Sequence, residues 1–527
     1  MKKIILSLFL LALSGASGQN IDSLLTNFLS VHDNKTIDGE PAKCEFETVA
    51  RIAAYYSRYS PAEQKEIAQI LSRPQTDTSV VSPNGKFRVH YNLNSSSSPK
   101  YDIAEFLIAL DSVYDKEITE IGFPMPPSDN GAGGDDLYDF YIIDLGSCCY
   151  GYTTPEVSLG NDKYTSFVTL DNDYGSGFYT HGIDAAKVTA AHEFNHGVQI
   201  GNYIYRTSDS YYYELTSTAM EDFVFDYVND YIAYMGEYFR HPEYSFPKNS
   251  GYDLAIWDIF VRDVLGYSAI VDTWKEMPNH YAVQAVDFVF NQNGSSLKRG
   301  LNEFGEWVFF TGFRAKPNRY FKDAAKYPLL SIYGWSGDPL FSEQTVTLEP
   351  VSNLYRNEIV GGDTLITLIT NGDVNGALTS SYRTIDANYR LYQSQSEGIE
   401  ITPDLSYDLT SDLLEELSVL HFLNNDLAGA TASLETTSTV YPQPFRYGDN
   451  SYLYFPLSKG ASETASLKIY SLSGRLLFAK EYRVNSGTSA LGWDATDLSG
   501  NKLGTGIYIY VTEKNGNILR GKFAVIN

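Results

Sequence analysis

The stretch that most restricts how this chain folds is AAHEFNH at residues 190–196, where two histidines stand four residues apart and a glutamate follows the first. In an α-helix residues i and i+4 share a face one turn apart, so that both imidazoles can reach one metal ion. The preceding residues favour a helix, because Gly182 is suited to a turn and Asp184 is expected to be the N-cap. His192 and His196 are therefore predicted to bind one metal ion from a helix.

This spacing is typical of catalytic zinc sites, which use imidazole nitrogens and keep one tetrahedral position for water. Glu193 is then expected to be the general base that deprotonates the metal-activated water. A third ligand is needed. Gln199 and Asn202 stand where the extended HExxHxxGxxH form requires glycine and a further ligand, so that form is excluded. Glu214, in a helical stretch downstream, has the separation typical of gluzincins and is the expected third ligand.

Three runs, at residues 192–199, 211–222 and 225–235, together resemble a family of secreted bacterial zinc metalloproteases, and the similarity covers about residues 40–315. The resemblance implies a gluzincin-like peptidase that acts on proteins or peptides. It makes Glu214 the third zinc ligand and matches Glu221 and Asp222 to an acidic pair of the family.

The residue that orients the first histidine is left open by this resemblance. Thermolysin-like gluzincins place an aspartate four residues after the glutamate ligand, whereas this chain has Thr218. Partners of this kind fix the tautomer and direction of a metal-binding imidazole. Thr218, Glu221 and Asp222 are the candidates.

An enzyme of this class also needs a donor for the oxyanion that develops during hydrolysis. Tyr252 and His280, both in the downstream helical part, are the candidates.

The three cysteines are Cys44, Cys148 and Cys149. In an oxidising compartment we expect a disulfide between Cys44 and Cys148 or Cys149, because adjacent cysteines rarely pair. The alternative is that the Cys44 thiolate caps the zinc as a latency switch.

The hydrophobic pattern predicts a multidomain α+β protein with a zincin-like catalytic domain, built from a sheet and helices, followed by β-sandwich modules of which the last is Ig-like. Strands are expected at 87–91 and 138–143 and an edge strand at 166–170, with helices over 103–121, 253–264, 268–277, 281–291 and 297–310. The expected units are a signal peptide at 1–18, a helical segment at 19–78 that is either a pro-segment or a subdomain, the metallopeptidase domain at 79–335, a β-rich module at 336–436 and an Ig-like domain at 437–527.

The motif series within residues 437–527 resembles the C-terminal sorting domain of the type IX secretion system. That resemblance implies the type IX machinery as a partner and an extracellular or outer-membrane-surface location. An ordinary Ig-like binding module is the alternative. Beyond the signal peptide, no transmembrane segment is expected, because no stretch approaches about 18 consecutive apolar residues.

The chain is acidic, with 39 Lys and Arg against 65 Asp and Glu and a formal charge of -26. This balance argues against nucleic acid or anionic membranes as partners. The acidic loops at 129–139 and 171–173 are interpreted as solvated turns, with Ca²⁺ sites as the alternative. The sequence thus favours a secreted zinc metalloendopeptidase, and the alternative is a cell-surface adhesin or structural protein that holds zinc without catalysis.

Overall fold

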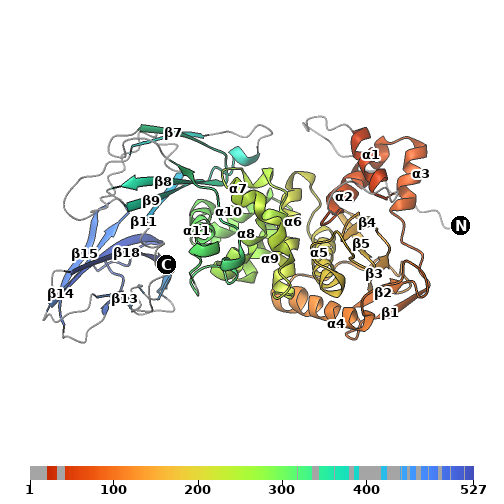
Figure 1. Cartoon of the computed structure of the whole chain (residues 1–527), viewed down its shortest axis with the longest axis horizontal. Coiled ribbons are helices and arrows are strands. Elements are labelled where there is room, and N and C mark those ends of the chain that lie inside the picture. The colour runs from red at the N-terminus through yellow and green to blue at the C-terminus, as the bar shows by residue number, and fades with distance from the viewer. Residues whose placement is uncertain are drawn as a thin grey trace.

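The computed structural model shows sheet and helices at the N-terminal end, a helical middle and β-rich units at the C-terminal end (Figure 1), which confirms the expected multidomain α+β class. The described residues are 21–32, 42–146, 148–316, 318–334, 343–360, 363–378, 385–390, 417–423, 440, 442–447, 452–457, 464–472, 474–484, 490–498, 500–514 and 517–527. The expected signal peptide at 1–18 and much of the expected module at 336–436 lie outside them.

Three helices precede the sheet: α1 (Ile21–His32), α2 (Phe46–Tyr55) and α3 (Pro61–Ile70). A capping box starts α3, since the Ser60 hydroxyl accepts from the Glu63 amide and the Glu63 carboxylate accepts from the Ser60 amide. The apolar face of α2 is buried, so this N-terminal part packs against the rest of the chain.

A five-stranded mixed sheet follows, with strand order β1-β2-β3-β5-β4. Its strands are β1 (Thr78–Val81), β2 (Phe87–Tyr91), β3 (Tyr138–Ile143), β4 (Gly151–Gly160) and β5 (Lys163–Asp171). β2 and β3 have the predicted bounds and pair in parallel. The connection between them contains α4 (Ile103–Tyr114) and a π-helical turn at Asp115–Ile121, as the helix prediction and a parallel crossover require.

The edge of this sheet differs from the prediction. Residues 166–170 lie in β5, which is paired on both sides, and β4 is the outer strand. β4 contains Pro155, which lacks an amide donor and weakens the strand signal, but is tolerated at an edge. Asn161 and Asp162, both at positive φ, make the tight turn that joins β4 to β5.

The motif lies in α5 (Gly182–Asn202), which packs on the sheet and beside α6 (Ser210–Val224) (Figure 1). Asp184 lies in the first turn and not at the predicted N-cap, because the helix begins at Gly182 itself. Gly197 permits close packing on the sheet, since a Cβ there would lie 2.1 Å from the Tyr138 hydroxyl.

The remaining helices cover α6 and match the predicted spans to within two residues at each end, apart from the short α7. They are α7 (Gly236–Arg240), α8 (Ala255–Leu265), α9 (Tyr267–Glu276), α10 (Ala282–Gln292) and α11 (Leu297–Phe309). Their apolar faces, together with the sheet and α5, form one continuous buried core.

Two β-rich units complete the chain. The first has a sheet of order β11-β9-β8-β6 and the pair β10-β7; its strands are β6 (Tyr333–Gly334), β7 (Glu343–Leu348), β8 (Ser352–Val360), β9 (Asp363–Asn371), β10 (Ile385–Arg390) and β11 (Leu417–Leu423). It shares the main core through side chains such as Tyr355, whose hydroxyl donates to the Gly305 carbonyl of α11.

The C-terminal unit is a sandwich with a core of its own, in which Phe455, Trp493 and Phe523 meet between a sheet of order β12-β18-β17-β14-β15 and the pair β13-β16. Its strands are β12 (Phe445–Arg446), β13 (Leu453–Pro456), β14 (Thr464–Ser471), β15 (Leu476–Arg483), β16 (Ala490–Trp493), β17 (Gly506–Lys514) and β18 (Asn517–Ile526). Among the described helices of the whole chain, none is long and apolar enough to cross a membrane.

Candidate metal centre

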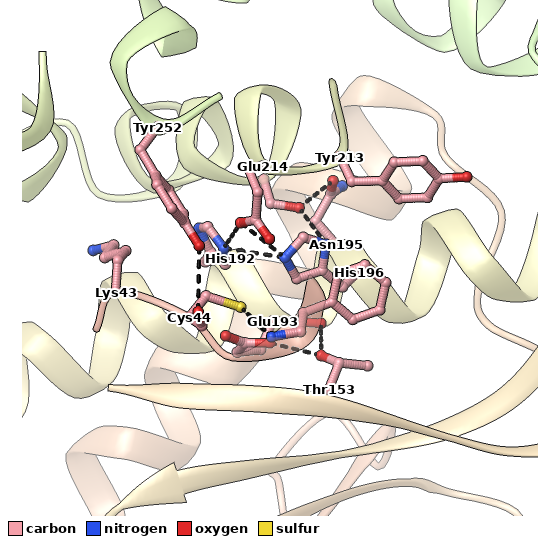
Figure 2. Close-up of polar contacts among 12 residues, drawn as sticks. Lys43, Cys44, Thr153, His192, Glu193, Asn195, His196, Tyr213, Glu214 and Tyr252 are labelled. Atoms are coloured by element: carbon pink, nitrogen blue, oxygen red, sulfur yellow. Dashed lines mark hydrogen bonds and ion pairs between the residues drawn. The ribbon is translucent and has the colours of Figure 1, made fainter. Parts of the chain in front are cut away.

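Two neighbouring helices bring the three predicted ligands together. His192 and His196 lie one turn apart on α5, and Glu214 reaches them from the first turns of α6 (Figure 2). All three are buried. Their helices are themselves packed on both sides, so the ligand side chains are held by rigid elements.

The ligand atoms converge on one point. His192 Nε2 lies 3.1 Å from His196 Nε2 and 3.1 Å from Glu214 Oε2, and His196 Nε2 lies 3.4 Å from the same oxygen. Two ligand atoms about 2.1 Å from a tetrahedral zinc ion are about 3.4 Å apart. The separations therefore fit a zinc ion placed between the three side chains.

A fourth donor completes the group: Cys44 Sγ, which lies with the three ligand atoms inside a mutual separation of 4.8 Å. Among the described residues, this is the one group of three or more His, Cys, Asp or Glu side chains whose ligand atoms lie close enough together to hold a metal ion. The second carboxylate oxygen, Glu214 Oε1, is buried without a hydrogen-bond partner in the described part of the chain. An orphaned buried oxygen beside two imidazoles and a thiol suits a site that takes a cation.

The pKa values of His192 and Glu214 also indicate a site that favours a cation. Burial opposes charge on His192, but hydrogen bonds with Glu214 and Glu221 raise its pKa to about 10. Burial likewise opposes charge on Glu214, and the charge and hydrogen bonds of His196 and His192 lower its pKa to about 2. The surroundings therefore stabilise positive charge between these side chains, and a divalent cation supplies it without protons.

Each histidine is oriented through its other ring nitrogen. His192 Nδ1 lies 2.9 Å from Glu221 Oε1, while His196 Nδ1 lies 2.8 Å from Gln199 Oε1 and 3.1 Å from the Ser217 hydroxyl. Partners of this kind fix ring direction and leave Nε2 for the metal.

Of the candidates for orienting the first histidine, only Glu221 contacts it. Asp222 pairs instead with Arg262 of α8 at 3.2 Å, and burial raises the pKa of the Asp222 carboxyl to about 6. Thr218 Oγ1 is buried and has no hydrogen-bond partner among the described residues.

Glu193 lies beside the fourth donor. Its carboxylate is adjacent to Cys44 Sγ (Figure 2), and the Thr153 hydroxyl of the edge strand β4 lies 2.8 Å from Glu193 Oε2. Burial, together with the carboxylates of Glu193 and Glu214, raises the pKa of the Cys44 thiol. Because the Glu193 carboxylate is adjacent to Cys44 Sγ, it faces the position that a water molecule would take if the thiol were absent.

The two oxyanion candidates are in different places. The Tyr252 ring stacks 6.1 Å from the His192 ring, and its hydroxyl donates to the Cys44 carbonyl at 3.4 Å. His280 lies beside Glu276 and Phe288 at the surface end of α9, and none of its described contacts is with the motif. The structure thus brings only Tyr252 to the site.

All three cysteines are free thiols, so the expected disulfide between Cys44 and Cys148 is not formed. Cys148 Sγ lies 2.7 Å from Cys149 Sγ, whereas Cys44 Sγ lies in the donor group with His192, His196 and Glu214. Sequence spacing could not reveal this, because Cys44 reaches the site through the packing of α2 on the sheet.

Several residues of the site were missed from sequence. Lys43 is buried and its ammonium donates to Glu221 at 3.0 Å and to Asp230, so it supports the carboxylate that orients His192. Gln199 and Ser217 each stand three residues after a ligand on the same helix, and this spacing was a usable signal.

The acidic loops behave as turns. Asp129 and Asp139 pair with Arg73, and Asp171 accepts from the amides of Leu145, Asp173 and Tyr174. Their carboxylates are occupied by these partners, which agrees with the interpretation as turns and adds nothing in favour of Ca²⁺.

The known proteins that resemble this chain give no information on its fold or function. No family model and no curated protein matches the chain. Among solved structures, PorZ, an essential bacterial surface component of the type IX secretion system of Porphyromonas gingivalis, is 16% identical over 32% of this chain and 30% of its own, with a TM-score of 0.14. Dimeric latent PorU of the same organism is 14% identical over 36% of this chain and 20% of its own, also with a TM-score of 0.14. This chain therefore covers less than a third of either protein, and at such TM-scores neither likeness bears on fold or function.

Proposed function

We propose that the protein is a secreted, zinc-dependent endopeptidase of gluzincin-like type. The observation that carries the proposal is the position of Glu193, whose carboxylate faces the fourth position of a group already supplied with three ligands. A zinc site that only stabilises a fold has no use for a buried carboxylate at that place, since burying it costs free energy.

In this proposal His192, His196 and Glu214 hold the zinc ion. A bound zinc ion acidifies a water molecule and polarises the scissile carbonyl. Glu193 accepts the proton of the attacking water and passes it to the leaving amine, while Thr153 keeps its carboxylate in place. The Tyr252 hydroxyl, which donates to a carbonyl in the structure, donates to the developing oxyanion.

One observation favours a second candidate, a closed structural zinc site in an adhesin or other surface protein. Cys44 supplies a fourth protein ligand, and four protein ligands are typical of structural zinc. The two functions differ in what Cys44 does. A structural site loses much of its zinc affinity in Cys44→Ala, whereas a catalytic site keeps its zinc and gains an open position.

The test uses residues 19–527 with Cys44→Ala, in which the fourth position is open. Zinc content and cleavage of unfolded casein are measured with and without Glu193→Gln. Asp222→Asn in the same background is the matched control, because Asp222 is an acidic residue of the site region that pairs with Arg262. We expect one zinc per chain in every form, and cleavage in all but Glu193→Gln. Equal cleavage with Gln at 193, or zinc binding with no cleavage by any form, would refute the peptidase.

We also propose that residues 437–527 direct the protein through the type IX secretion machinery to the outside of the cell. The support is the motif series in the sequence and the separate sandwich core of this unit. In a bacterium with this system, the full chain should reach the medium or cell surface, and a chain ending at residue 436 should remain in the periplasm. Export of both forms would contradict the sorting role.

A further inference from the structure

The segment that carries Cys44 lies along the start of the edge strand β4, whose first four residues are buried. The Ala42 amide donates to the Cys148 carbonyl at 2.9 Å, the Tyr150 amide to the Ala42 carbonyl at 3.1 Å, and the Glu45 amide to the Gly151 carbonyl at 3.3 Å. Residues 42–45 thus pair with the chain that leads into β4, through an isolated parallel bridge between Ala42 and Cys149, and Thr153 of β4 holds Glu193. The edge of a sheet is a common binding place for an extended polypeptide.

The same segment fills the positions around the metal centre. Cys44 Sγ is the fourth donor, and it accepts a hydrogen bond from the Phe46 amide at 3.2 Å, as thiolate ligands commonly do. The Cys44 carbonyl accepts from the Tyr252 hydroxyl. The Phe46 ring, 1% exposed, stacks on the His196 ring with centroids 4.1 Å apart and covers this ligand from solvent.

A buried charge cluster anchors the segment. Lys43 is 4% exposed and pairs with Glu221 and Asp230, and its ammonium also lies 4.8 Å from the centre of the Tyr150 ring and 5.2 Å from that of Tyr234. Removing one partner of such a buried pair leaves the other charge buried without compensation, which is strongly destabilising. The segment is therefore held firmly, and the hold includes the carboxylate that orients His192.

We propose that residues 42–46 are an internal pseudosubstrate: they occupy the path of a polypeptide substrate along the start of β4 and close the metal centre through Cys44 Sγ, so that the protein is latent until this segment moves away from β4. The inference rests on the proposed peptidase function, whose site it regulates. The proposal also makes the chain from Cys148 to Tyr150, together with the start of β4, the backbone to which an extended substrate would pair. With zinc bound by His192, His196 and Glu214, opening would leave the fourth position to a water molecule, and the released Cys44 sulfur would take up one proton from solvent.

The test compares residues 19–527 as wild type, as Cys44→Ala and as Cys44→Ser, with Cys148→Ala as the matched control for loss of a thiol outside the donor group. Cys44→Ser keeps the size of the side chain and guards against a folding defect. Cobalt-substituted wild type and Cys148→Ala should show a thiolate-to-cobalt charge-transfer band in the near ultraviolet, and both Cys44 variants should lack it. A wild type without the band would overturn closure by Cys44.

Access is measured separately by titrating the zinc-loaded proteins with a peptide hydroxamate, which needs an open metal position but no catalysis. We expect at least tenfold tighter binding, and at least tenfold faster casein cleavage, for both Cys44 variants than for wild type and Cys148→Ala. Equal hydroxamate affinity in all four proteins contradicts the pseudosubstrate. Tighter hydroxamate binding by the Cys44 variants without any cleavage would support closure by Cys44 and refute the peptidase function. The failure of the pseudosubstrate proposal can therefore be distinguished from the failure of the proposed function.

Discussion

Asp258 makes the stability of the helical region depend on pH, and Asp258→Asn should remove this dependence. Asp258 lies on α8, fully buried, and accepts a hydrogen bond from the Thr216 hydroxyl of α6 at 2.8 Å; Thr216 in turn accepts from the indole of Trp274 at 3.1 Å. Burial raises the pKa of this carboxyl from 3.8 to about 7, although the hydrogen bonds from Thr216 and Tyr212 oppose the rise.

Because the pKa of Asp258 is higher in the folded state, the folded protein holds a proton that the unfolded chain releases. Its contribution to stability is fully present below the unfolded pKa and is lost as the pH rises through about 7. At about 1.4 kcal/mol per pKa unit, the total is about 4 kcal/mol, of which about 3 kcal/mol falls between pH 5 and pH 9. Asparagine keeps the shape and an acceptor for Thr216 but never becomes charged.

The assay is urea unfolding followed by tryptophan fluorescence at pH 5 and pH 9. The free energy of unfolding of Asp258→Asn relative to wild type should rise by about 3 kcal/mol between the two pH values. Other buried carboxyls, such as Asp253 and Glu303, cancel in this difference because both proteins contain them. Asp272→Asn, at a half-exposed carboxylate paired with Lys275, is the control and should change by less than about 1 kcal/mol. A difference between Asp258→Asn and wild type that does not vary with pH would refute the reasoning.

Three further outcomes follow from the site and its support. Glu221→Gln should weaken zinc binding about 10- to 100-fold, because the first histidine loses its charged orienting partner, whereas Asp222→Asn should leave it within about twofold; competition with a chelator measures both. Gly251→Ala should unfold at a lower temperature than Gly266→Ala. Both glycines have positive φ, but of the two only Gly251 would place a Cβ 2.1 Å from a backbone oxygen of α6. Equal melting temperatures of the two variants would count against that contact. Arg73→Met should lower the free energy of unfolding by about 3–5 kcal/mol, because it leaves three acidic side chains without their shared cation, and denaturant titration will show whether the loss is that large.

Much of the local structure follows directly from the sequence. The strands at 87–91 and 138–143 have the bounds that their hydrophobic pattern predicted, and the helices after the motif begin and end within two residues of the predicted positions. These features depend on neighbours in the chain, so a local pattern is sufficient. The meeting of His192, His196 and Glu214 was also predictable, because helical geometry fixes the first pair and spacing suggests the third.

The remaining features depend on contacts between distant parts of the chain. Nothing around Lys43 or Cys44 indicates that the segment just before α2 lies against the motif helix, and the expected disulfide was the more ordinary interpretation of Cys44. The edge strand was misplaced because Pro155 hides β4, while the residues of β5 read equally well as an outer or an inner strand. His280 and Tyr252 were equivalent in sequence, and only the packing of Gly251 against α6 brings Tyr252 to the site.

The most direct test of the metal centre is zinc K-edge X-ray absorption on residues 19–527, after metal analysis of the purified protein. The structure predicts one zinc ion per chain, with two imidazoles and one carboxylate oxygen at about 2.0–2.2 Å and one sulfur at about 2.3 Å, and Cys44→Ala should lose only the sulfur. A protein that binds no zinc, or a coordination shell without imidazole, would contradict the account.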